Sequence, residues 1–165
     1  MTHPFRIIGI GSAYGDDQLG WQIVEQLQAT LPADIPVDLL ICASPASELL
    51  GLMAHADTII LVDAVHSGTS PLGHFHCWQE LAQLPHQGLS SHGVDIATML
   101  QLAEILGQLQ HWKLYGVEIG LEYLNQINVP LSQPITATIP KLIDNIQQDI
   151  TDYLQTLIPN VDSTI

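Results

Sequence analysis

Short apolar runs recur along the chain and are separated by amphipathic segments. Arg6–Ile10, Val37–Cys42 and Thr58–Val62 are rich in Ile, Leu and Val, as the buried strands of a parallel sheet are. Lys113–Ile119 is a further run of this kind, and Phe75–Trp78 is predicted to form a short edge strand. Asp63 directly follows the clearest of these strands and is predicted to end it. The pattern therefore predicts a sheet of about five strands.

The intervening segments carry apolar residues at helical spacing. A first helix is predicted over about 19–31, ended by Pro32, and a second begins at Ser44-Pro45, with serine as N-cap and proline in the first position. Two further helices are predicted from their inward-facing residues: a third from Ile96, Met99, Leu100, Ala103 and Leu106, and a last one over 139–157 from Leu142, Ile146, Ile150 and Leu154.

This alternation of strands and helices predicts an α/β fold, a three-layer sandwich with a mostly parallel twisted sheet flanked by helices. The length fits a single domain over residues 1–158, followed by a flexible C-terminal tail at 159–165. In such sheets, ligands bind beyond the carboxyl ends of the strands, where the strand order reverses. The residues that follow the first and third strands are therefore the first candidates for function.

Polar side chains stand at those positions. Asp16 and Asp17 follow the first strand, Asp63 follows the third, and His92 ends a predicted loop over 84–92. If the first and third strands are neighbours, all of these residues lie at one edge of the sheet. Two carboxylates and an imidazole suit a transition metal such as nickel or zinc and leave coordination positions open.

Each candidate also has a purely structural explanation. Asp16 and Asp17 precede a helix, where a carboxylate caps free N–H groups and complements the helix dipole. His92 alone is as expected for a surface loop, and Glu118 at the end of a strand is interpreted as structural. Asp63 is the hardest to explain in this way, because a carboxylate at the buried end of an apolar strand is costly without a partner.

The charge balance excludes several classes of partner. Three basic residues face 17 acidic ones, for a net charge of −14. Such a chain lacks the basic surface that binds nucleic acid or an anionic membrane, so a cation or a basic protein surface is the expected partner. No apolar run approaches the roughly 20 residues of a transmembrane helix. The two cysteines, Cys42 and Cys77, are isolated, which favours a reducing cytoplasm.

The ordered motifs resemble a known family. GIGSAYGDDQLGWQIVEQL, ILVDAV, SSHGVDIATML, YGVEIG and PLSQPITATIPKLIDNI follow one another as in the hydrogenase maturation endopeptidases. The resemblance places the metal-contacting positions at Asp17, Asp63 and His92. Ser12 stands where the family usually has Asn, and Gln18 where it usually has glycine, so the turn around Gln18 is expected to differ.

The resemblance implies an endopeptidase, grouped with the aspartic-type peptidases, that trims the C-terminus of the large-subunit precursor of a nickel–iron hydrogenase. It implies no permanent cofactor, with nickel recognised in the substrate protein. The enzyme resembles the type of peptidase that serves cytoplasmic bidirectional, NAD-linked hydrogenases. It is expected to be a monomer. Hydrolysis uses either the metal, which activates water or the carbonyl, or Asp17 or Asp63 as general base.

Other functions are weaker alternatives. Gly9, Gly11 and Gly15 follow a strand, but their GxGxxxG spacing is not that of a dinucleotide-binding turn, and two carboxylates stand where a pyrophosphate would bind. A serine or cysteine hydrolase would need a GxSxG motif or a paired cysteine. A non-catalytic nickel chaperone on the same fold stays open, because fold does not fix function.

Overall fold

The computed structural model describes residues 4–85, 96–122 and 124–158. In chain order the elements are β1 (Phe5–Ile10), the 3-10 helix η1 (Gly15–Gln18), α1 (Leu19–Thr30), β2 (Val37–Cys42), α2 (Pro45–Met53), β3 (Thr58–Val65), β4 (Phe75–Trp78), the 3-10 helix η2 (Leu81–Gln83), α3 (Ile96–Ile105), β5 (His111–Glu118) and α4 (Gln133–Thr156). The predicted strands and helices are all present, with some boundaries shifted.

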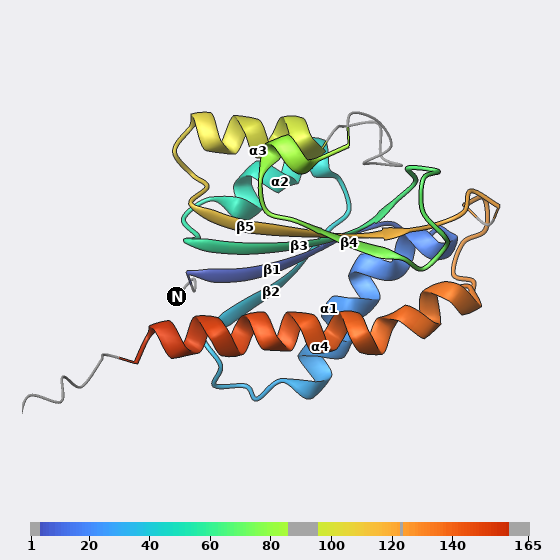
Figure 1. Ribbon diagram of the computed structural model, residues 1–165. Helices are drawn as coiled ribbons and strands as arrows, with labels where there is room; N and C mark the ends of the chain where they lie inside the picture. Colours follow the sequence, from blue (N-terminus) through green and yellow to red (C-terminus); the bar gives the residue numbers. More distant parts are fainter. Residues whose placement is uncertain (1–3, 86–95, 123, 159–165) are drawn as a thin grey trace, which may run out of the picture.

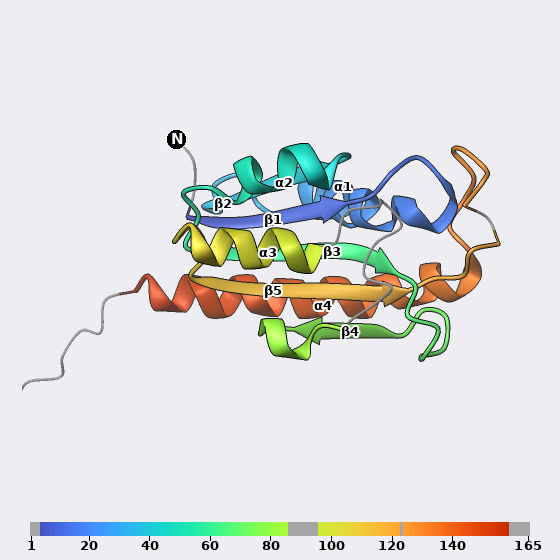
Figure 2. The ribbon, with the colours of Figure 1, turned by 90° about the horizontal axis from the view of Figure 1, so that it is seen from above.

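The sheet has the order β2-β1-β3-β5-β4, in which only β4 runs antiparallel. Figures 1 and 2 show α1 and α4 on one face and α2 and α3 on the other, which confirms the predicted three-layer α/β sandwich. Each face has its own apolar core, one beneath α1 and α4 and the other beneath α2 and α3. The strand order reverses between β1 and β3, so the predicted switch point lies between these two strands.

Three predicted boundaries are wrong. β3 does not end at Asp63 but continues to Val65, because β5 pairs with it as far as Val65↔Glu118. α3 ends at Ile105, and Leu106, predicted to face inward, is 54% exposed. α4 begins at Gln133, not at 139, since a proline in the first turn needs no hydrogen-bond partner for its missing N–H. No helix in the described ranges is both long and apolar enough to cross a bilayer.

All three basic side chains of the chain are engaged within the fold. Arg6 is 5% exposed and donates to the carbonyls of Leu52 and Ala54 at 2.6 and 2.7 Å, which satisfies the C-terminal end of α2. Lys113 pairs with Asp149, and Lys141 lies 5.7 Å from the centre of the Phe75 ring. The surface acids therefore have few cations to face.

Candidate functional site at the carboxyl ends of the strands

The loops after β1, β3 and β5 form what we call the carboxyl-end rim, at the right of Figures 1 and 2. The turn after β1 is tight because α1 packs closely on the strand. A Cβ added at Gly9 would lie 2.0 Å from the carbonyl oxygen of Gly20, and one at Gly20 would lie 2.1 Å from that of Ile10. Glycine at both positions lets the acidic pair sit directly above the end of β1.

Gln18 adopts a backbone conformation that is open to any residue. Its backbone is right-handed helical (φ −67°), and the left-handed angle falls on Gly15 (φ 47°). The Gln18 side chain instead donates from Nε2 to the carbonyl oxygens of Gly15 and Val129, both at 2.8 Å. A side chain in place of glycine therefore ties the β1 turn to the loop that precedes α4.

Asp17 is buried, with 2% of its surface exposed. The Ser12 hydroxyl donates to its carboxylate, and the Ser12 N–H donates to its backbone carbonyl at 3.2 Å. The serine that replaces the family's asparagine thus fixes the orientation of the carboxylate.

Asp63 is completely buried, and neither of its carboxylate oxygens has a hydrogen-bond partner within the described part of the chain. Its place on β3, beside β1, brings it near Asp17. Burial raises the pKa of the Asp63 carboxyl well above its usual range, and the negative charge of Asp17 raises it further. The neighbouring Ala64 N–H, the smallest of the three causes, lowers it. A buried carboxyl group of this kind is expected where a ligand completes its environment.

Asp16 has a different role from its neighbour. It is 4% exposed and accepts two hydrogen bonds from Ser132, from the backbone N–H and from the hydroxyl, both at 2.7 Å. It was expected to cap the helix that follows it, but it binds the N-cap residue of α4. The sequence Ser132-Gln133-Pro134 carries the same kind of helix-start signal as Ser44-Pro45 and would have indicated where α4 begins.

His92 and Glu118 are the remaining candidates. His92 lies outside the described residues, so its position relative to Asp17 and Asp63 is not given. Glu118 is buried and accepts hydrogen bonds from the Ser67 hydroxyl and the Gly68 N–H, both at 2.8 Å, in line with its structural interpretation. In residues 4–85, 96–122 and 124–158, no three His, Cys, Asp or Glu side chains are placed to hold a metal ion.

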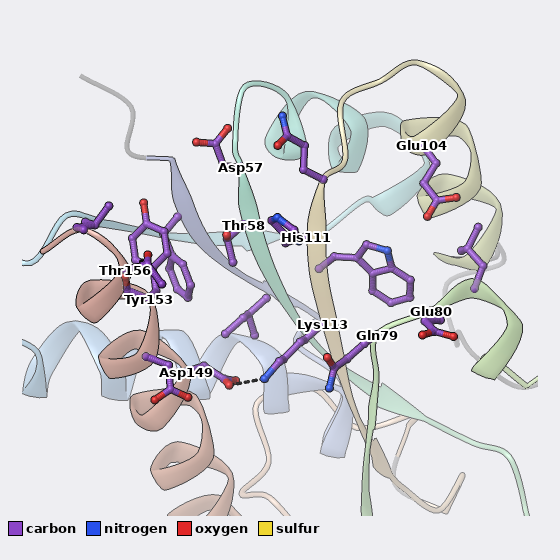
Figure 3. Close-up of a pocket in the computed structure, with 17 residues that line it drawn as sticks. Asp57, Thr58, Gln79, Glu80, Glu104, His111, Lys113, Asp149, Tyr153 and Thr156 are labelled. Carbon is purple, nitrogen blue, oxygen red and sulfur yellow. Dashed lines mark hydrogen bonds and ion pairs between the residues drawn. The ribbon is translucent and has the colours of Figure 1, made fainter. Parts of the chain in front are cut away.

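A cavity of about 930 Å³ lies at the opposite end of the sheet, where the parallel strands begin, and we call it the amino-end cavity. Figure 3 shows its lining, which includes Lys113 and Asp149, joined by an ion pair, and Tyr153 of α4. Asp149 also accepts a hydrogen bond from the Tyr115 hydroxyl at 2.6 Å. Lys113 and Asp149 are thus paired with each other, unlike the Asp63 carboxylate.

Several solved structures resemble this fold. The hydrogenase maturating endopeptidase HybD from Escherichia coli matches with a TM-score of 0.72 and 24% identity, over 90% of this chain and 93% of that one. The [NiFe] hydrogenase maturation protease HycI from Thermococcus kodakarensis KOD1 matches with a TM-score of 0.69 and 25% identity, over 91% of this chain and 93% of that one. No significant match is found among curated proteins.

The sequence pattern of the hydrogenase maturation proteases matches residues 21–149. That range includes Asp63 but begins just after Asp16 and Asp17, so the family match is independent of the acidic pair. It covers well over half of the chain. The protein therefore belongs to the hydrogenase maturation protease family, whose members are endopeptidases that act on hydrogenase large-subunit precursors.

Proposed function

We propose that this protein removes a C-terminal peptide from the large-subunit precursor of a nickel–iron hydrogenase, and that Asp17, Asp63 and His92 contact the nickel of that precursor. The observation that carries the proposal is the completely buried Asp63 carboxyl, with no hydrogen-bond partner among the described residues. A divalent cation presented by the substrate would supply the missing partner.

The two carboxylates suit this task because both are held at the strand ends before a substrate arrives. Ser12 orients Asp17, and the sheet fixes Asp63 between β1 and β5. The raised pKa of Asp63 favours its protonated form in the free enzyme. Metal ligands must be deprotonated, so docking of the nickel-loaded precursor would release that proton. A metal-free precursor offers no cation that could stabilise the negative charges of Asp17 and Asp63.

Hydrolysis of the peptide bond needs a base that takes a proton from the attacking water and an acid that returns one to the leaving amine. Asp17 and Asp63 are neighbouring carboxyl groups whose negative charges repel each other, so the two together hold a proton more readily than either would alone. We propose that the carboxylate that accepts the proton of the water passes it to the amine nitrogen as the C–N bond breaks.

The enzyme is proposed to need no permanent cofactor and to act as a monomer on the precursor of a bidirectional, NAD-linked hydrogenase. The absence of a permanent cofactor and the type of hydrogenase rest on the resemblance of the sequence motifs, whereas the monomeric state is an expectation that the motifs do not address. The net charge of −14 supports a neutral or basic docking surface on the precursor.

The test is a mass measurement on purified large-subunit precursor, either nickel-loaded or metal-free, incubated with the enzyme. Loss of a C-terminal peptide from the nickel-loaded sample alone is the expected result. Cleavage of both samples would refute the recognition of nickel. Binding of the nickel-loaded precursor without any loss of mass would identify a nickel chaperone instead of a protease.

A further inference from the structure

A second cavity, of about 550 Å³, opens at the carboxyl-end rim, and we call it the rim cavity. Leu72 lies on its wall after β3, Gly120 after β5, and Val129 and Pro130 before α4. Asp16 borders the rim cavity directly and is the chain neighbour of Asp17. Its volume falls in the range of about 300–1,000 Å³ that is typical of ligand sites.

The rim carries apolar side chains that face solvent. Leu72 is 50% exposed, Leu121 56% and Ile127 55%, and Tyr14 is 42% exposed. These are four of the nine large hydrophobic side chains that are exposed in the described ranges, and all four lie on the loops after β1, β3 and β5. Apolar groups gathered around a buried acidic site mark a surface that a partner covers.

The loops that present these side chains are held in place. The Gly15 N–H donates to the Gln126 carbonyl at 2.8 Å, and the Asn128 N–H donates to the Ala13 carbonyl at 2.9 Å, across an antiparallel bridge between Tyr14 and Ile127. The cavity wall is therefore formed before a ligand binds, which lowers the entropic cost of binding.

The chemistry of the lining selects one kind of occupant. Glu122 lines the cavity, and no lysine or arginine is among the lining residues, so an anionic group of a ligand would be repelled. Gln126 and Gln133 also line it, and a side-chain amide offers both a donor and an acceptor to a peptide backbone. The apolar walls suit an uncharged apolar side chain, and the amides suit a peptide backbone. Because a free C-terminal carboxylate would be repelled by Glu122, the expected occupant is an internal peptide segment.

We propose that the rim cavity is the subsite for an apolar residue of the precursor that flanks the scissile bond. The inference rests on the proposed function, because it assigns a second contact to the same substrate. Nickel would fix the precursor over Asp17 and Asp63, and the rim cavity would fix the chain beside it. The two contacts together would select the bond to be cut.

The test compares Leu72→Asp and Gly120→Val with the control Leu106→Asp. Leu72 and Leu106 are almost equally exposed, at 50% and 54%, but Leu106 lies after α3, at the opposite end of the sheet. Gly120→Val would narrow the cavity, since an added Cβ lies 3.7 Å from the Leu72 methyl carbons, an ordinary contact. Cleavage rates are measured over a range of nickel-loaded precursor concentrations, with thermal melts to verify folding.

We expect both rim variants to raise KM about tenfold, which corresponds to losing the burial of roughly one apolar side chain. The kcat should stay within about twofold of the wild type. Leu106→Asp should match the wild type. An unchanged KM in Leu72→Asp would overturn the subsite. The subsite would also be overturned if the wild type formed a dimer and the Leu72→Asp substitution dissociated it, because a second copy of the chain would then cover the cavity.

Direct binding separates this inference from the proposed function. If the wild type binds the precursor but never cleaves it, the protease function fails, yet weaker binding by Leu72→Asp would still support the subsite. If the wild type cleaves and Leu72→Asp binds the precursor equally well, only the subsite fails. Replacing the apolar residues beside the scissile bond with Asp, one at a time, should identify one whose effect on KM is not additive with Leu72→Asp.

Discussion

The two ends of the sheet differ in how their charged groups are satisfied. At the amino end, the larger cavity has Lys113 paired with Asp149, and Asp149 also bonded to Tyr115 (Figure 3). At the carboxyl end, Asp63 is completely buried and has no hydrogen-bond partner in the described part of the chain. At the amino end the buried side of Asp149 is satisfied by Lys113 and Tyr115, whereas at the carboxyl end the described residues leave the Asp63 carboxylate without a partner.

Volume is therefore a poor guide to chemistry in this molecule. The amino-end cavity, of about 930 Å³, is lined by one lysine, and that lysine is already paired with Asp149. The smaller rim combines a buried acidic pair, exposed apolar groups and the switch point of the sheet. Variants at the two ends should accordingly separate loss of activity from loss of stability.

Asp63→Asn should have the largest effect. We expect cleavage of the nickel-loaded precursor to fall by about 10³-fold or more, because the amide can neither take a proton nor serve as an anionic ligand. Asp57→Asn, an exposed carboxylate at the amino-end cavity, is the matched control and should cleave normally. Substantial cleavage by Asp63→Asn would remove Asp63 from the proposed machinery.

Ser12→Ala should have an intermediate effect. Loss of the hydroxyl that orients Asp17 should lower kcat/KM by about 10–100-fold, as for other groups that position a ligand. Ser47→Ala removes an exposed hydroxyl that donates to the Ser44 carbonyl and should leave kcat/KM unchanged. Equal rates for both variants would mean that Asp17 needs no orientation by Ser12.

Stability should respond to pH through Asp63. The Asp63 pKa is raised in the folded protein. Its contribution to stability is therefore fully present below the ordinary aspartate pKa of 3.8 and is lost as pH rises through the folded pKa. At pH 8 Asp63→Asn should therefore be more stable than the wild type, by about 1–3 kcal/mol. Thermal melts should show this advantage shrinking as pH falls, and a constant advantage would contradict the assignment.

Lys113→Met should have the smallest effect, and only on stability. The ion pair is partly solvent-exposed, since 32% of the lysine side chain is accessible, and Asp149 keeps its bond from Tyr115. We expect a loss of about 1 kcal/mol, seen as a melting temperature lower by about 2–4 °C, and an unchanged kcat/KM. A marked loss of cleavage would show that the two ends are coupled and would break the comparison.

The sequence predicted the architecture well because its signals are local. Among the described residues, apolar β-branched runs and helical spacing identified the five strands and four α-helices but not the 3-10 helices η1 and η2. The order of strands and helices was enough to predict a mostly parallel sheet. Asp63 was singled out because a carboxylate within an apolar run conflicts with its surroundings. The errors fall at element ends, such as the end of α3 and the start of α4, where pairing and capping by distant residues decide the boundary.

The contacts that assemble the rim could not be predicted in the same way. The bonds from Ser132 to Asp16 and from Gln18 to Val129 join residues 116 and 111 positions apart. No periodicity or local motif indicates such a pair. The rim cavity likewise forms from loops after different strands, and so becomes visible only once the strand order is known.

The long separation between Asp16 and Ser132 has a consequence for folding kinetics. Parallel strands and contacts between distant residues close slowly, because the entropic cost of the loop precedes the energy of the contact. A chain still being synthesised can form β1 and β3, with Asp17 in the turn after β1 and Asp63 on β3, while α4 has yet to emerge. The β1 turn would then lack its partner on α4, so peptidase activity should first appear when the last helix docks.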